Sequence, residues 1–196
     1  MMQQQTQQLL NALRQNSEAL IDDGLLLATR HRYSRAYMCF QAAIDEMNKY
    51  FSIERTEKVA PINWPAIDVE LLNDNTVLEK DTIIEQALVK LLKERAFGNE
   101  AQTLQEFVNA IDSFKRVLAG DEEALVAALD EPLQYMMFDG EAHIKQVMHE
   151  RNELRKSVLQ VDITNDGSIA PEQMITREHM TEIGMAALAN QLMMDY

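Results

Sequence analysis

Residues 34–51 read SRAYMCFQAAIDEMNKYF, and this stretch decides the fold class. Its apolar side chains recur every three or four residues, the spacing of one face of an α-helix; they are Tyr37, Phe40, Ala43, Ile44, Met47, Tyr50 and Phe51. Neither proline nor glycine interrupts the stretch. We therefore predict a helix that begins at an N-cap, Ser34, and ends near Arg55.

The residues before this stretch have the same periodicity and predict another helix, over residues 6–29. Only the short polar break from Thr29 to Tyr33 separates the two helices, so they should pack as an antiparallel αα-hairpin. Residues 1–8 are rich in glutamine, and we expect this end of the helix to fray.

The rest of the chain is also mainly helical. Helical spacing, with breaks at glycine and proline, predicts helices over residues 81–97, 100–118, 121–130 and 141–160, a helical turn over 133–138, and a last helix that ends near 193. Residues 56–79 contain two prolines and an Asn-Asp-Asn turn, which are typical of an irregular loop. Residues 158–163 have β character before a turn at 165–167, so we expect a short β-like excursion before the last helix.

The composition agrees with one globular all-α domain over residues 1–196. The chain is 46% apolar and 26% charged, which excludes a disordered chain, and its six glycines and four prolines disfavour an all-β fold. Cys39 is the only cysteine, so an internal disulfide is excluded. No stretch approaches the roughly 18 consecutive apolar residues of a membrane span, and no signal peptide is visible, so we expect a cytoplasmic protein.

The net charge of −14 is unevenly distributed. Residues 1–60 carry seven basic and seven acidic side chains, and residues 61–140 carry six basic and 16 acidic ones, a net −10. Residues 141–196 carry five basic and nine acidic side chains, a net −4. An acidic middle repels phosphate backbones, so RNA binding is possible but disfavoured, and it would have to use the first or last third.

The sequence predicts no metal and no cofactor. The four histidines, at positions 31, 143, 149 and 179, lack the spacing of a metal site, and no glycine-rich phosphate loop is present. Residues 162–169 are similar to the first half of a calcium-binding EF-hand loop. Position twelve of such a loop would be Gln173, which cannot close the cage as a bidentate carboxylate does.

Two polar groups of residues are candidates for binding. The first lies at the predicted hairpin turn, where Arg30, His31, Arg32 and Arg35 gather, and continues along the second helix to Asp45, Glu46 and Lys49. The acidic pair is either a solvated helix pair or, because it interrupts an apolar face, partly buried with an arginine partner. We predict that Arg32, Arg35, Asp45, Glu46 and Lys49 bind RNA or a protein partner.

The second group lies on the helix predicted over residues 141–160. It consists of Lys145, His149, Asn152 and Lys156, at spacings of four, seven and eleven, with Arg151 and Arg155 on a neighbouring face. This stripe is either a solvated face or a groove for an anion, RNA or a partner. His149 can exchange a proton near neutral pH and Arg151 can stabilise a phosphate, so these two are the candidate catalytic residues.

The residues resemble those of a known family, the AbiV-type abortive-infection proteins of the HEPN-like superfamily. The resemblance covers about two thirds of the chain, at its two ends, and leaves residues 56–135 aside. It is carried by Ala19–Gly24, Arg32–Ala36, Ala42–Lys49, the basic helix running into strand-like residues over His149–Ile163, Pro171 and Ile175–Glu178.

The resemblance implies a HEPN-like helical bundle and a role in antiphage defence by abortive infection. It further implies translation arrest, recognition of a phage-encoded protein, and a homodimer. Many HEPN proteins are metal-independent ribonucleases with an Arg-x(4–6)-His motif. Here Arg151 and Asn152 begin such a motif, but positions 156–158 are Lys, Ser and Val, so the usual motif is absent.

Three functions therefore stay open at this point. The first is an effector that binds a partner and arrests growth at translation. The second is a ribonuclease that uses His149 with Arg151 or Arg155, so the sequence leaves open whether the protein is an enzyme. The third is a non-catalytic helical regulatory subunit.

Overall fold

A computed structural model describes residues 2–59, 75–95, 103–118, 141–158, 162–164, 167–169 and 175–195. The described helices are α1 (Met2–Thr29), α2 (Tyr33–Val59), α3 (Asn75–Arg95), α4 (Leu104–Leu118), α6 (Glu141–Val158) and α8 (Arg177–Met194). Between α6 and α8, strands β1 (Asp162–Thr164) and β2 (Gly167–Ile169) pair antiparallel, with Ile163 opposite Ser168. The predicted all-α bundle, with its β-like excursion before the last helix, is confirmed.

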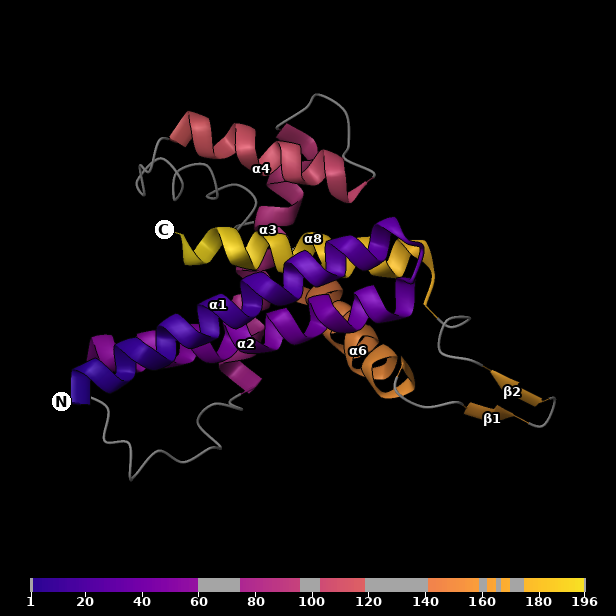
Figure 1. Ribbon diagram of the computed structural model, residues 1–196, viewed down its shortest axis with the longest axis horizontal. Helices are drawn as coiled ribbons and strands as arrows, with labels where there is room; N and C mark the ends of the chain where they lie inside the picture. Colours follow the sequence, from indigo (N-terminus) through magenta and orange to yellow (C-terminus); the bar gives the residue numbers. More distant parts are fainter. Residues whose placement is uncertain are drawn as a thin grey trace.

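Helices α1 and α2 lie side by side as the predicted αα-hairpin (Figure 1). The amide of Arg32 donates to the Leu27 carbonyl and the amide of His31 to the Ala28 carbonyl, both at 3.0 Å. This pair of bonds is a Schellman motif, which ends a helix and satisfies its last carbonyls. The residue at its left-handed position is His31, with φ 56°.

Several boundaries differ from the predicted ones. Helix α2 begins at Tyr33, so Ser34 is buried inside its first turn and is not the N-cap; the Arg32 carbonyl accepts the first bond, from Ala36. Residues 2–8, where we expected fraying, belong to α1, and both described ends of the predicted loop, 56–59 and 75–79, are helical. The helices predicted within 121–138 lie outside the described residues.

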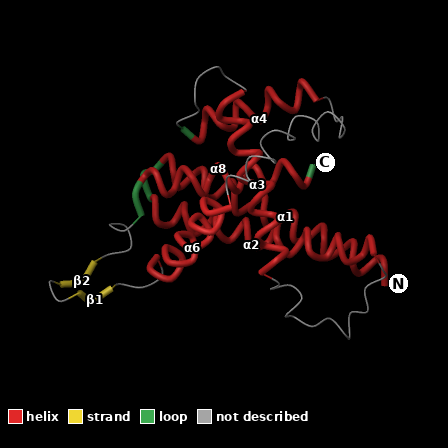
Figure 2. Tube along the Cα trace, turned by 180° about the vertical axis from the view of Figure 1, so that it is seen from behind, coloured by secondary structure: helices red, strands yellow, loops and turns green. Residues whose placement is uncertain are grey.

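Helix α8 is the centre of the described bundle. It contacts α1, α2, α3 and α4, and both views show it running between α4 and the α1–α2 hairpin (Figure 1, Figure 2). Its residues from 183 to 190 are all buried. Because this part of α8 is buried on every side, it has no polar face, and its residues are mainly Ala, Leu, Met and Ile. Among the helices that the structure describes, none is long and apolar enough to cross a membrane.

Two helical glycines let Phe40 of α2 enter this core. A Cβ atom at Gly24 of α1 would lie 2.6 Å from Phe40 Cε1. A Cβ atom at Gly184 of α8 would lie 2.6 Å from Leu104 Cδ2 and 3.1 Å from Phe40 Cε2. Glycine lowers helix stability relative to alanine, so helix propensity does not explain these two residues. The close approach of Phe40 and Leu104, which leaves no room for a Cβ atom, does explain them.

We predict that Gly184→Ala destabilises the protein by about 1–3 kcal/mol, because the added methyl group overpacks the core. Urea unfolding followed by circular dichroism measures the change. The double variant Gly184→Ala/Leu104→Ala should lose less than the sum of the two single variants, since Leu104 is the group that the methyl meets. An unchanged or higher stability in Gly184→Ala would contradict this account of the packing.

Candidate functional site

A buried carboxylate, Glu85 of α3, organises the polar interior. Its side chain is 2% exposed. Arg151 of α6 donates to both carboxylate oxygens, at 2.6 and 3.2 Å, and the amides of Asn190 and Gln86 donate at 2.6 and 2.8 Å. A buried carboxylate is strongly unfavourable unless it is paired and hydrogen-bonded, and these four bonds meet that requirement.

Asn190 completes the cluster from α8. It is fully buried, and its amide also donates to the Ala186 carbonyl at 3.0 Å, one turn earlier in the helix. Its Oδ1 atom has no hydrogen-bond partner among the described residues. The cluster of Glu85, Arg151 and Asn190 therefore joins α3, α6 and α8 through directional bonds, in addition to their apolar packing.

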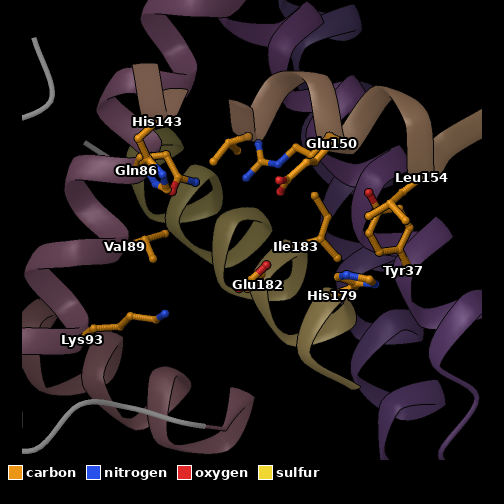
Figure 3. Close-up of a pocket in the computed structure, with 12 residues that line it drawn as sticks. Tyr37, Gln86, Val89, Lys93, His143, Glu150, Leu154, His179, Glu182 and Ile183 are labelled. Atoms are coloured by element: carbon orange, nitrogen blue, oxygen red, sulfur yellow. The ribbon is translucent and has the colours of Figure 1, made fainter. Parts of the chain in front are cut away.

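A pocket of about 170 Å³ lies beside this cluster, lined by residues of α2, α3, α6 and α8 (Figure 3). Its polar lining residues are Tyr37, Gln86, Lys93, His143, Glu150, Arg151, His179 and Glu182. Figure 3 shows Tyr37 and His179 on one side of the pocket and His143 and Gln86 on the other. No three His, Cys, Asp or Glu side chains in the described ranges are grouped to hold a metal ion.

Tyr37 brings a hydroxyl to the pocket from the core. The residue is 1% exposed, and its hydroxyl has no partner within the part of the chain that the structure describes. Burial raises the pKa of Tyr37 to about 12, and the charges of Arg151 and Arg155 counteract that rise only in part. Tyr37 is therefore a neutral hydroxyl that can donate a hydrogen bond, and it is unsuited to act as a base near neutral pH.

His179 is fixed by the start of α8. Thr176 caps this helix, its hydroxyl accepting from the His179 amide at 3.2 Å. The His179 Nδ1 atom in turn accepts from the Thr176 amide, at 3.4 Å. This bond needs Nδ1 without a proton, so the neutral ring carries its proton on Nε2 and can donate it to another group.

The structure separates the two residues predicted to be catalytic. Arg151 lines the pocket and binds Glu85, whereas His149 is exposed. They are two residues apart on α6, roughly 200° around the helix axis, so their side chains leave it on different sides. Lys145 and Asn152 are exposed like His149, and the side chain of Lys156 lies outside the described residues.

The arginine partner expected for the acidic pair on α2 is Arg155. Its guanidinium lies 2.9 Å from Asp45 Oδ2, and Gln41 donates to Asp45 Oδ1 at 3.1 Å. Burial raises the pKa of Asp45, and Arg155 opposes that rise. Glu46 and Lys49 form a separate surface pair at 2.6 Å, in which the lysine is about half exposed. Such a pair contributes little to stability.

Arg32 and Arg35 are exposed at the start of α2 and are not brought to the pocket. Arg35 lies ten residues before Asp45, roughly 15 Å along the helix. The predicted residues whose side chains are described therefore fall into five places. These are the Arg32 and Arg35 end of α2, the Glu46–Lys49 surface pair, the Asp45–Arg155 contact between α2 and α6, the exposed Lys145, His149 and Asn152 of α6, and Arg151 at the buried Glu85.

Sequence reasoning missed Glu85, Asn190, His143 and His179 as site residues, and it assigned Tyr37 only to the core. Glu85 gave a usable signal, because helical spacing places it on one face with Leu88 and Leu92. A charged residue on such a face needs a partner. The capping role of His179 gave no comparable signal, since glutamate or glutamine is the usual residue three positions after the cap.

The helical hairpin, the helix that leads to a β excursion and the central last helix are consistent with a HEPN-like helical bundle. A family model described as AbiV, of the HEPN type, matches residues 5–191. The chain therefore belongs to the AbiV family, which indicates a role in abortive infection, a form of antiphage defence. The match includes residues 56–135, for which the sequence alone showed no resemblance. No curated protein and no solved structure gives a significant match.

We predict that Arg151→Met destabilises the protein by about 3–5 kcal/mol, because Glu85 is left buried without its countercharge. The double variant Glu85→Leu/Arg151→Met should recover most of this loss, since an apolar pair leaves no uncompensated charge. Denaturant unfolding of both single variants and the double variant measures the coupling. Additive losses, with no recovery in the double variant, would contradict the role given to this pair.

Replacing Tyr37 by phenylalanine should leave stability at pH 7 unchanged or slightly higher, because the buried hydroxyl has no partner among the described residues. The pKa of tyrosine is about 10 in an unfolded chain and about 12 here, so between these pH values the hydroxyl ionises in the unfolded chain but not in the fold. Relative to its value below pH 10, the stability of the wild type should therefore fall by on the order of 2 kcal/mol as the pH rises from 10 to 12, a loss that phenylalanine cannot show. Melting temperatures from pH 9 to 12 should therefore fall more steeply in the wild type than in Tyr37→Phe.

Proposed function

We propose that the protein is an abortive-infection effector that binds a partner and arrests growth at translation. Membership of the AbiV family supports the role in defence. The observation that carries the proposed mode of action is the position of Arg151, the residue at which a nuclease-like motif begins. Its guanidinium is bound to the buried Glu85 and is directed away from His149.

This position favours binding over cleavage. A metal-independent ribonuclease needs a proton-transfer group and a cation within hydrogen-bond reach of the same phosphate. Arg151 already spends two of its five N–H groups on Glu85, and the charge of that buried carboxylate offsets the charge of the guanidinium, so Arg151 would bind a phosphate more weakly than an unpaired arginine. His149 is exposed on another side of α6 and offers no second group to the pocket.

The partner we propose is a phage-encoded protein, and the active form we propose is a homodimer in the cytoplasm. Both follow from the resemblance to the family, as does translation as the step that is arrested. The net charge of −14 disfavours RNA as the partner. Exposed polar side chains of α6, among them His149 and Asn152, remain available for protein contacts.

A metal-independent ribonuclease is the second candidate function, and the pocket beside Glu85 is the observation in its favour. His143 and His179 line this pocket together with Arg151 and the unpartnered hydroxyl of Tyr37. Perturbed or unpaired polar groups that converge on one pocket are typical of a reactive site. In this alternative the histidine that exchanges protons is His143 or His179, in place of His149.

Expression in bacteria, with and without phage challenge, tests both candidates. We expect the wild type to stop incorporation of labelled methionine while ribosomal and transfer RNA stay intact, and we expect His149→Ala, His143→Ala and His179→Gln to behave like it; glutamine is a usual residue at this capping position. RNA fragments that disappear in any of these histidine variants would establish the ribonuclease instead. Absence of arrest under both conditions would favour a regulatory subunit.

A further inference from the structure

Helix α6 is the least buried of the described helices. Among its residues with described side chains, 142–155, Ile144 alone is buried, and the apolar Val147, Met148 and Leu154 are half-buried. The shorter helix α4 has four buried side chains: Leu104, Phe107, Ala110 and Ile111. Because apolar burial is the main force that docks one helix on another, it holds α6 less strongly than it holds the neighbouring helices.

Two ion pairs join α6 to its neighbours, and neither adds much net strength to the contact. Arg155 lies 2.9 Å from Asp45 of α2, and because its side chain is 51% exposed the pair contributes little. Arg151 binds the buried Glu85 of α3, where the loss of water from both charges offsets their attraction. If α6 moved away as a whole, both charges of this pair would regain water, whereas a substitution of Arg151 leaves Glu85 buried in place.

Unsatisfied polar atoms lie beside the same contact. Within the part of the chain that the structure describes, three buried side-chain atoms have no hydrogen-bond partner: the Tyr37 hydroxyl, Gln41 Oε1 and Asn190 Oδ1. Tyr37 lines the pocket that α6 borders. Gln41 donates to Asp45, and the Asn190 amide donates to Glu85. These two carboxylates are the ones that the arginines of α6 bind. A buried polar atom without a bond destabilises the state that buries it, so these atoms disfavour the docked position of α6.

We propose that α6 docks on and releases from the bundle as a unit while α1, α2 and α8 stay packed, and that its release opens the pocket beside Glu85. Five of the residues that line this pocket belong to α6: His143, Val147, Glu150, Arg151 and Leu154 (Figure 3). Release therefore removes one wall of the pocket and brings water to Glu85 and Tyr37. An isolated helix of 18 residues is marginal in water, so α6 should lose most of its helical structure when it is released. Release is a property of the chain alone and goes beyond the proposed function.

Labelling of buried thiols in the purified full chain tests the proposal. In a Cys39→Ala background, which removes the one native thiol, Ile144→Cys places a reporter on α6 and Ile183→Cys places one on α8. The native side chains are 1% and 2% exposed, so a thiol reagent reacts with either site only after it opens. Relative to the rates in denaturant, we expect Ile144→Cys to react at least tenfold faster than Ile183→Cys. Equal rates would overturn the proposal, because they would show that α6 opens only with the whole bundle.

Hydrogen exchange of the unsubstituted chain gives a second measurement that does not weaken the α6 contact. Amides of residues 147–154, in the middle of α6, should be protected at least tenfold less than amides of residues 183–190 in α8. Equal protection of the two segments would also overturn the proposal.

A core substitution far from α6 separates release from unfolding of the whole bundle. Ile21 of α1 is buried in the part that should stay packed. Ile21→Val should therefore speed labelling of the Ile183→Cys reporter by about two- to tenfold and leave labelling of the Ile144→Cys reporter unchanged. Equal acceleration at both reporters would overturn the proposal.

Two further variants, measured with the Ile144→Cys reporter, identify the contacts that release breaks. Tyr37→Phe removes an unsatisfied hydroxyl from the docked state only, so it should slow labelling at least threefold. Arg155→Gln removes the pair with Asp45 and should speed labelling by about two- to fivefold. The matched control is Lys58→Gln, which breaks an ion pair within α2, with Glu54, and should leave the rate unchanged. Unchanged or faster labelling in Tyr37→Phe would show that release does not uncover the hydroxyl, and it would overturn the proposed opening of the pocket.

Discussion

The pairing of one buried charge ties three helices of the described bundle together. Glu85 lies on α3 among apolar side chains, and its carboxylate is stable there only while Arg151 and Asn190 donate to it. The three residues lie on α3, α6 and α8, so the same bonds that satisfy the charge fix these helices relative to one another. The guanidinium of Arg151 therefore has a structural role, whether or not it also takes part in chemistry.

Close packing around two helical glycines provides the second constraint. Phe40 lies against Gly24 and Gly184, which brings α1, α2 and α8 closer than larger residues would allow.

Periodicity predicted the elements of this fold better than their contacts. The stripe from Tyr37 to Phe51 correctly predicted α2 and the hairpin. For the acidic pair on α2 the sequence left two alternatives open, and the structure shows the one in which Asp45 has an arginine partner. The sequence suggested Arg151 as a candidate catalytic residue that stabilises a phosphate. Its pairing with Glu85 could not be predicted, because Glu85 lies 66 positions earlier and no local spacing reveals such a contact. Ser34 was misplaced as a cap because the Schellman motif at His31 turns the chain without a glycine.

We propose that Arg151 serves to hold the helical bundle together and takes no direct part in growth arrest. The most direct measurement is growth arrest by the double variant Glu85→Leu/Arg151→Met, compared with wild type at equal levels of folded protein. If Arg151 acts only through Glu85, the double variant should arrest growth like the wild type, although it lacks the guanidinium. A folded double variant that has lost arrest would contradict the account and return Arg151 to the active machinery.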